Sequence, residues 1–316
     1  MQKFPEGLEL ESRPCPIGCK SDDEPVLEGS DRIHRIPGVF QIVRCRACGL
    51  MRTNPRPTPS TIGVYYPDDY GPYASTDAPP PPTASPTKMR LRRALGLETR
   101  RVPPVKPGRL LELGCASGSY LEEMRRAGWK VEGVEYSDTA ARRARAKGFE
   151  VQTSTVESAV VSPGSVDLVA AWMVLEHLHD PVGALRNIRE WARPDGYLAV
   201  SIPVHGGLFL RLFGNASYDL HLPNHLYHFS SRSIRQLMER AGWTVEKIFW
   251  QRNANTLLCT LEYTSEERGW KRTNALVKWL RNANSAGKLR VLLGWILGLT
   301  RASGRVEIWA RPTIAK

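Results

Sequence analysis

The chain has 316 residues, of which 41% are hydrophobic and 24% charged; this composition is typical of a globular protein and excludes wholesale disorder and a fibrous repeat. Six cysteines are too few for a disulfide-built fold, and neither a membrane-span-length apolar stretch nor a secretory signal is found, so we expect a cytoplasmic protein with reduced thiols. The net charge of +12 is concentrated in residues 204–316, which hold 17 basic and 7 acidic side chains.

Four of the six cysteines lie within residues 1–56, as two closely spaced pairs: Cys15 with Cys19, then Cys45 with Cys48. Each pair lets two thiolates converge on one ion from a tight turn, and two such turns complete a tetrahedral Zn²⁺ site. Four sulfur ligands leave no open coordination position, so the zinc would be structural. Disulfides and free thiols are the alternatives, and a reducing compartment disfavours disulfides. Residues 1–56 are therefore predicted to form a zinc ribbon.

Residues 57–107 are predicted to link the ribbon to the rest of the chain. The proline-rich run 76–88 favours extended backbone and lacks donors for a strand ladder. A short basic amphipathic helix is expected over 88–101. The aromatic residues of 65–73 either cover a substrate site or pack as part of a simple linker.

From Arg109 onward, apolar strands alternate with helices. Strands are predicted over 109–114, 130–137, 149–154, 166–174 and 197–204, and helices over 117–129, 138–148 and 180–196. This alternation indicates βαβ units and a parallel sheet. A loop rich in His, Pro and Asn is then followed by a helix over 230–243, a strand over 244–253, a helical insertion over 262–301 and a strand over 305–312. The sequence thus predicts an α/β domain over 108–316 with a helical C-terminal cap.

A loop of small residues joins the first of these strands to its helix. Gly114, Ala116 and Gly118 would let the backbone approach a ligand, and the helix N-terminus offers free N–H groups. Glu135, 21 residues after Gly114, ends the next strand, where a carboxylate can accept hydrogen bonds from both hydroxyls of a ribose. The dinucleotide pattern G-x-G-x-x-G is not met, because Ala116 and Ser119 occupy its second and third glycine positions. The alternative is an ordinary βα turn with a surface Glu.

The run from Glu112 to Gly118 resembles the E/D-x-G-x-G-x-G loop of class I S-adenosylmethionine (SAM) methyltransferases, with Ala116 at the middle glycine. Residues 166–181, which contain Leu-Glu-His-Leu-x-Asp-Pro, and residues 221–243 are also similar to that family. The resemblance implies a Rossmann-like seven-stranded fold, SAM as cofactor and methyl transfer as the reaction. It also implies that the loop wraps the methionine end of SAM, that Glu112 orients the amino group and that Glu135 holds the ribose.

Further SAM contacts are expected from Thr155, Val156 and Trp172. Thr155 and Val156 follow the third strand, in the place that usually flanks adenine in this family, and Trp172 is equally plausible as a core residue. The ribbon strengthens the resemblance, because many methyltransferases of bacterial sugar and secondary metabolism carry one before the catalytic domain.

Five of the seven histidines fall in two clusters, one after the fourth strand and one in the later loop. Transfer to a hydroxyl or a carbon acid requires removal of a proton, which suits an imidazole with a pKa of about 6.5. The segment 224–230 resembles the loop of sugar C-methyltransferases in which a His acts as base, so His225 is the first candidate base and His177 the second. The alternative for each is a hydrogen-bonded structural residue. The residues expected to contact the acceptor are His221, Asn224 and Tyr227.

The predicted function is SAM-dependent methyl transfer to oxygen or carbon of a small-molecule or glycan acceptor. We expect the acceptor to be anionic, such as a nucleotide sugar or a lipid-linked glycan, because the last third is basic. The alternative is an RNA methyltransferase that binds nucleic acid through the ribbon and the basic third. Against it, residues 172–175 lack the Asn/Asp-Pro-Pro-aromatic motif of enzymes that methylate exocyclic base amines. The apolar, cationic stretch 274–301 either packs on the sheet as a cap or contacts a membrane surface.

Overall fold

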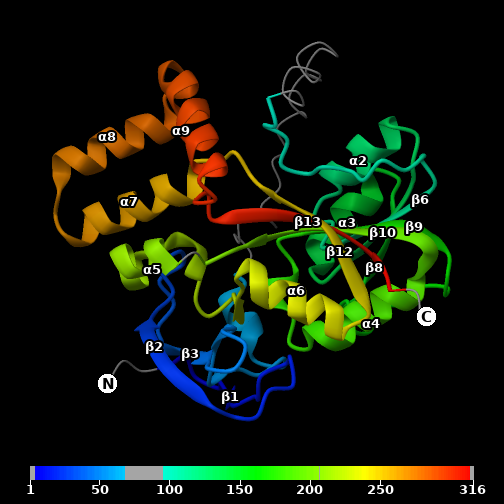
Figure 1. Cartoon of the computed structure of the whole chain (residues 1–316), viewed down its shortest axis with the longest axis horizontal. Helices are drawn as coiled ribbons and strands as arrows, with labels where there is room; N and C mark the ends of the chain where they lie inside the picture. The colour runs from blue at the N-terminus through cyan, green and yellow to red at the C-terminus, as the bar shows by residue number, and fades with distance from the viewer. Residues whose placement is uncertain (1–3, 68–94, 206, 314–316) are drawn as a thin grey trace.

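The computed structural model describes residues 4–67, 95–205 and 207–313, and a seven-stranded sheet lies at its centre (Figure 1). In spatial order the strands are β12 (Trp243–Trp250), β13 (Arg305–Pro312), β10 (Ala192–Pro203), β9 (Val166–Trp172), β6 (Arg109–Leu113), β7 (Lys130–Glu135) and β8 (Glu150–Thr153). All run parallel except β13, which is antiparallel to both of its neighbours. The predicted α/β class with a Rossmann-like seven-stranded sheet is confirmed.

Helices cover both faces of this sheet. On one face α2 (Ser119–Arg126) and α3 (Asp138–Ala146) pack in one apolar cluster, and on the other α4 (Pro181–Trp191) and α6 (Ser231–Arg240) pack in a second. Helix α6 shows why these segments are helical: Ile234, Leu237 and Met238 are spaced three and four residues apart and are fully buried. A capping box closes its first turn: the Ser230 side chain accepts a hydrogen bond from the Ser233 amide, and the Ser233 side chain accepts one from the Ser230 amide.

The N-terminal segment forms a second, four-stranded antiparallel sheet with the order β11-β4-β3-β2. Three of its strands, β2 (Asp23–Gly29), β3 (Phe40–Cys45) and β4 (Met51–Thr53), come from the ribbon region, whereas β11 (Tyr227–His228) comes from the later His-rich loop. A further two-residue pair joins β1 (Leu10–Glu11) to β5 (Arg56–Pro57). The loop that carries the candidate base is thus tied to the ribbon by strand pairing.

Three helices between β12 and β13 stand to one side of the central sheet (Figure 1). They are α7 (Asn255–Glu267), α8 (Lys271–Asn282) and α9 (Gly287–Leu299), and we call them the helical arm. The helical region begins before the predicted residue 262, because β12 ends at Trp250 and Leu258 already packs with Val277 and Leu297. Among the described residues, no helix combines the length and apolarity that crossing a bilayer requires.

The structure does not contain the helix predicted for the linker within the residues that it describes. Most of the helix predicted over 88–101 falls outside the described residues, and residues 95–101 form turns and irregular backbone instead. There the Leu95 carbonyl accepts hydrogen bonds from the side chains of Arg252 and Trp295. Tertiary contacts, rather than hydrogen bonds within a helix, therefore pair this backbone carbonyl. Before the gap, Ile62–Tyr65 form a 3-10 turn with Ile62 and Tyr65 buried.

Arg56 joins the ribbon region to the His-rich loops. Its Nε and Nη2 contact the Glu11 carboxylate at 3.0 and 2.9 Å, its Nη1 donates to Tyr227 Oη at 2.9 Å, and its Nη2 donates to the His179 carbonyl at 3.0 Å. The Arg56 side chain is only 3% exposed, so its loss would remove buried hydrogen bonds to Tyr227 and His179 and leave the partly buried Glu11 carboxylate without its cation.

We expect Arg56→Met to lower the free energy of unfolding by about 3 kcal/mol, because it removes the ion pair and the hydrogen bonds that a buried charged side chain makes. Arg44→Met is the matched control: Arg44 pairs with Glu24 but is 43% exposed, so we expect a loss of at most about 1 kcal/mol. Urea denaturation followed by circular dichroism measures both values. Equal effects for the two variants would contradict the role given to Arg56.

Candidate functional site

The small-residue loop after β6 bends back toward β7 in a conformation that needs glycine. Gly114 and Gly118 have φ angles of +67° and +78°, and a Cβ added at Gly118 would lie 2.9 Å from the Phe149 ring. Ala116 also has a positive φ, +46°. This strain is held in place because the Ala116 amide donates to Glu135 Oε2 at 2.8 Å.

Glu135 is fixed at the carboxyl end of β7 by backbone donors. Its Oε2 accepts from Ala116 and its Oε1 accepts from the Ser137 amide at 2.8 Å. The side chain is buried, and burial raises the pKa of its carboxyl group. Each carboxylate oxygen keeps a further lone pair, so the two oxygens of Glu135 can still accept hydrogen bonds from two ribose hydroxyls.

Three buried polar atoms near this loop have no hydrogen-bond partner within the described part of the chain: Glu112 Oε2, Tyr120 Oη and Trp172 Nε1. Burial also raises the pKa of Glu112 to about 8. Unsatisfied buried polar groups are costly and are commonly resolved by a ligand or by water. The methionine end of SAM carries an ammonium and a carboxylate, so it could supply both donors and acceptors to such atoms. Of the three residues, Trp172 lines the cavity described next, whereas Glu112 and Tyr120 do not.

A cavity of about 840 Å³ opens at the carboxyl ends of β6, β7, β8 and β9, where open α/β sheets bind ligands. Predicted cofactor residues line it, namely Gly114, Ala116, Glu135, Thr155, Val156 and Trp172, and so do the predicted histidines His177, His221 and His225. Glu112 and Gly118 do not line it; Gly118 packs against Phe149.

His177 and His225 lie together in this cavity, with ring centroids 4.7 Å apart. His225 Nδ1 lies 2.7 Å from the Asp219 carbonyl, and His177 Nδ1 lies 3.0 Å from the Asn224 carbonyl and 2.9 Å from Tyr66 Oη. A carbonyl only accepts, so in both rings Nδ1 carries the proton and Nε2 the lone pair. Burial lowers the pKa of His177 to about 4 and that of His225 well below its usual value. Both imidazoles are therefore neutral near pH 7 and available as proton acceptors.

Two residues expected to contact the acceptor do not reach the cavity. Asn224 is fully buried, and its Nδ2 donates to the Tyr65 carbonyl at 2.7 Å. The Tyr227 hydroxyl is held between Arg56 and the His179 carbonyl, behind the wall. Both side chains hold the loops in place, so a direct contact with the acceptor has no support in the geometry.

Other lining residues were not predicted, among them Ile33, His34 and Arg13 from the ribbon region and Arg305 from β13. No spacing in the sequence marks them, because they reach the cavity only through the packing of the ribbon on the main sheet. The aromatic segment 65–73 was expected either to cover a substrate site or to pack as a linker. Tyr66 of this segment lines the cavity, and residues 68–73 lie outside the described residues.

Glu176 extends the histidine pair into a cluster with two chemical options. Its carboxylate and one nitrogen from each of His177 and His225 lie within 4.8 Å of one another. Glu176 is fully buried, neither carboxylate oxygen has a partner within the described part of the chain, and burial raises its pKa to about 8. The cluster can therefore hold a proton on the carboxyl group, and its donor set is also one that a divalent cation accepts.

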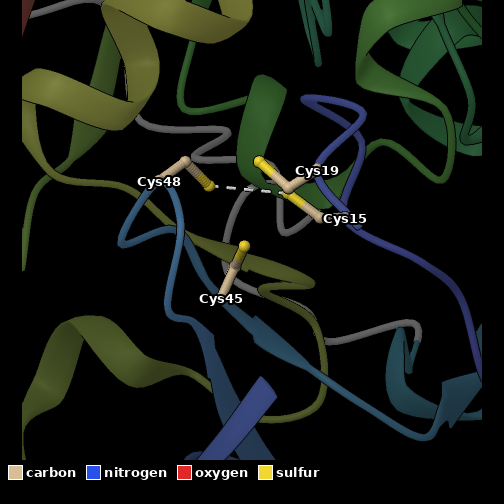
Figure 2. A group of neighbouring side chains, drawn as sticks. All are labelled: Cys15, Cys19, Cys45 and Cys48. Carbon is tan, nitrogen blue, oxygen red and sulfur yellow. Dashed lines mark hydrogen bonds between the residues drawn. The ribbon is translucent and has the colours of Figure 1, made fainter. Parts of the chain in front are cut away.

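The four N-terminal cysteines converge, as Figure 2 shows. The sulfur atoms of Cys15, Cys19, Cys45 and Cys48 all lie within 4.8 Å of one another, and none of the chain's cysteines forms a disulfide. Burial raises the pKa of Cys15 and of Cys48 to about 11, and a bound cation would favour their thiolate forms. Four converging sulfurs fit the ligand set of a closed zinc site.

The family model described as "Methyltransferase domain" matches residues 88–248, just over half of the chain. The chain belongs to this methyltransferase family. Its family and its sheet topology are those of class I SAM-dependent methyltransferases.

Two curated relatives show how far the likeness extends. The methyltransferase is 30% identical over 106 residues to a ubiquinone biosynthesis O-methyltransferase of Albidiferax ferrireducens, covering 31% of this chain and 42% of the relative. It is 25% identical over 211 residues to the C-methyltransferase NovU of Streptomyces niveus, covering 65% of this chain and 47% of the relative. The chain thus spans less than half the length of these relatives. A solved SAM-dependent methyltransferase from Mesorhizobium loti superimposes with a TM-score of 0.46 at 15% identity, over 70% of this chain and 96% of that one.

Buried neutral histidines make the methyltransferase sensitive to acid. His228 is 1% exposed, lies outside the cavity and hydrogen-bonds Thr53 Oγ1 through Nε2 at 3.2 Å; burial lowers its pKa well below 6.5. Below pH 6.5 the unfolded chain therefore binds a proton at this residue that the folded chain does not. Its contribution to stability is complete above that pH and is lost as the pH falls.

We expect the stability difference between the wild type and His228→Gln to change by about 1.4 kcal/mol per pH unit below about pH 6, with the wild type losing more. Glutamine keeps a partner for Thr53 but does not titrate. Urea denaturation of both proteins between about pH 7 and about pH 5 measures the difference. A difference that stays constant over this range would show that His228 takes up its proton at the same pH in the folded chain as in the unfolded chain, which would contradict the lowered pKa.

Proposed function

We propose that this methyltransferase transfers the methyl group of SAM to an oxygen or carbon atom of a small-molecule acceptor, with a histidine as the general base. The observation that carries the proposal is the pair His177 and His225. Both are neutral and both point a proton-free Nε2 away from a carbonyl-bound Nδ1, in the same cavity as Glu135. The names of the two curated relatives, one an O-methyltransferase and one a C-methyltransferase, support the same acceptor atoms.

The chain's residues would divide the work between the two ends of the cavity. When bound, SAM supplies an already activated methyl group, so the protein must align the acceptor and take up one proton. Glu135 and the loop after β6 hold the cofactor end. His177 retains more exposed surface than His225, which is 3% exposed, so His177 is the more accessible Nε2. His225 packs against it, with ring centroids 4.7 Å apart, and its own Nε2 is the second candidate to accept the proton.

Shape and charge bear on the acceptor class. A cavity of about 840 Å³ that also holds the cofactor supports a small acceptor. The net charge predicts an anionic acceptor. The cavity wall supports this prediction with three cationic residues, Arg13, Arg56 and Arg305. Arg13 and Arg56 both face the Glu11 carboxylate and Arg305 faces Asp219, so two carboxylates offset part of the charge of the three arginines. Six of the 17 cations of the last third lie on α8 and α9 of the helical arm instead.

We expect His177→Ala and His225→Ala to keep SAM affinity and to lower kcat by about 10²-fold or more, because each variant removes one of the two histidines proposed to accept the proton.

We expect Glu135→Gln to weaken SAM binding about 10-fold or more. Glu150→Gln changes an exposed residue of the neighbouring β8 and should leave SAM binding unchanged. Calorimetry measures SAM affinity. Radiolabelled methyl transfer to nucleotide sugars, phenolic metabolites and RNA identifies the acceptor class.

Full turnover in both histidine variants would remove them as bases. Methyl transfer confined to RNA would replace the small-molecule acceptor with the alternative function. Unchanged SAM affinity in Glu135→Gln would overturn the ribose assignment.

We also propose that the four-cysteine cluster holds a structural Zn²⁺. We expect about one zinc per chain by elemental analysis of protein purified without chelator, and loss of the metal with a lowered melting temperature in Cys45→Ser. Cys259→Ser, a buried thiol of α7 outside the cluster, is the matched control and should keep its zinc. Metal-free protein with an unchanged melting temperature would contradict the proposal.

A further inference from the structure

The helical arm exposes large apolar side chains that nothing in the described part of the chain covers. Leu276 and Trp279 of α8, and Leu289, Leu292, Ile296 and Leu299 of α9, are between 46% and 58% exposed. Single exposed apolar residues are ordinary, but a cluster of this size on one element marks a contact surface.

The exposed residues of α9 form one face of the helix. Leu289, Leu292, Ile296 and Leu299 follow one another at intervals of three and four residues, which places them along one side. The other side of α9 is attached to the protein: Leu297 is 8% exposed, and a Cβ at Gly294 would lie 2.7 Å from the Arg252 carbonyl. Packing is therefore already satisfied on the inner side, and the outer side is left apolar and open.

The stretch of chain that carries this apolar face is rich in cations and has no acidic residue. Residues 268–306 contain eight lysines and arginines up to Arg301, a ninth at Arg305, and no Asp or Glu. Lys278 and Arg281 pair with acids of α7. By contrast Lys271, Arg272, Lys288 and Arg301 are exposed, and no ion pair to them is found among residues 4–67, 95–205 and 207–313.

We propose that the helical arm binds the surface of an anionic lipid membrane, with the apolar side chains of α9 and α8 inserted at the level of the headgroups. Apolar residues and cations on the same helices match the two components of such a surface, its acyl boundary and its negative charge. A second copy of the chain fits less well, because its arm would bring the same unpaired cations against these. A nucleic acid would pair with the cations but leave the leucines and Ile296 in water.

The arm is joined to the acceptor end of the cavity. The Tyr218 amide donates to Thr260 Oγ1 of α7 at 3.0 Å, and the Tyr218 and Tyr263 rings lie 5.9 Å apart. Tyr218 itself lines the cavity. Docking through α8 and α9 would therefore hold the cavity close to the membrane. The inference does not depend on the proposed reaction, since membrane binding is measured without turnover.

The test is co-sedimentation of the full chain with vesicles of phosphatidylcholine alone or of phosphatidylcholine with phosphatidylglycerol. We expect binding to the anionic vesicles only, weakened by salt. Leu292→Glu/Leu299→Glu should reduce the affinity at least about 10-fold by removing insertion, and Arg272→Gln/Lys288→Gln should reduce it about 10- to 30-fold by removing two charges near the surface.

Matched controls separate these effects from general changes in charge. Val160→Glu alters an 82% exposed apolar residue outside the arm, and Lys106→Gln/Lys130→Gln removes two exposed cations outside it; neither should change the binding. Circular dichroism and the melting temperature show that each variant is folded. Equal binding to both kinds of vesicle, no binding to either, or undiminished binding by folded Leu292→Glu/Leu299→Glu would overturn the proposal. So would sedimentation velocity showing that these leucines hold a dimer that ignores vesicles.

Discussion

Strand direction is the constraint on which the rest of this structure depends. Six strands of the central sheet run parallel, so the loops after β6, β7, β8 and β9 all open at one edge. Residues distant in sequence, such as Gly114, Glu135 and His177, meet there because each follows the end of a strand. Three of the described non-glycine residues with positive φ, Ala116, Met173 and His221, line the same cavity. Backbone strain is thus concentrated where a ligand would bind.

The ribbon region forms part of the site as well as being a zinc-ligand candidate. Pairing of β11 with β4 ties the His-rich loop to the ribbon, and Arg56 adds buried hydrogen bonds to the same junction. Through this junction Arg13 and His34 reach the cavity wall. A change in the cysteine cluster is therefore expected to affect the position of His225 as well as the stability of the ribbon.

The charge of the last third separates from the chemistry of the cavity. The net charge led us to expect an anionic acceptor, yet the one lining arginine from this part of the chain, within the described residues, is Arg305, which faces Asp219 at 3.7 Å. Of the exposed cations for which the described residues offer no ion pair, Lys271 and Arg272 lie on α8 and Lys288 lies on α9, the helices that carry the exposed leucines of the arm. The charge on the surface of the arm bears on what the protein docks on, whereas the charge in the cavity bears on which acceptor it binds.

Local patterns in the sequence determined the α/β class, the strand and helix positions of the methyltransferase core, the loop from Gly114 to Gly118 and Glu135, because periodicity and turn chemistry act over a few residues. The close spacing within each cysteine pair was visible for the same reason, whereas the meeting of the two pairs depends on how the ribbon region folds. Only the tertiary structure decided that Asn224 and Tyr227 lie behind the cavity wall and that Tyr66 and Arg305 line it. It also decided that His177 is more accessible than His225, since side-chain burial and lining depend on packing between segments far apart in the chain. The apolar face of α9 was visible in the sequence as a pattern, but whether it was covered depended on where the helix packed.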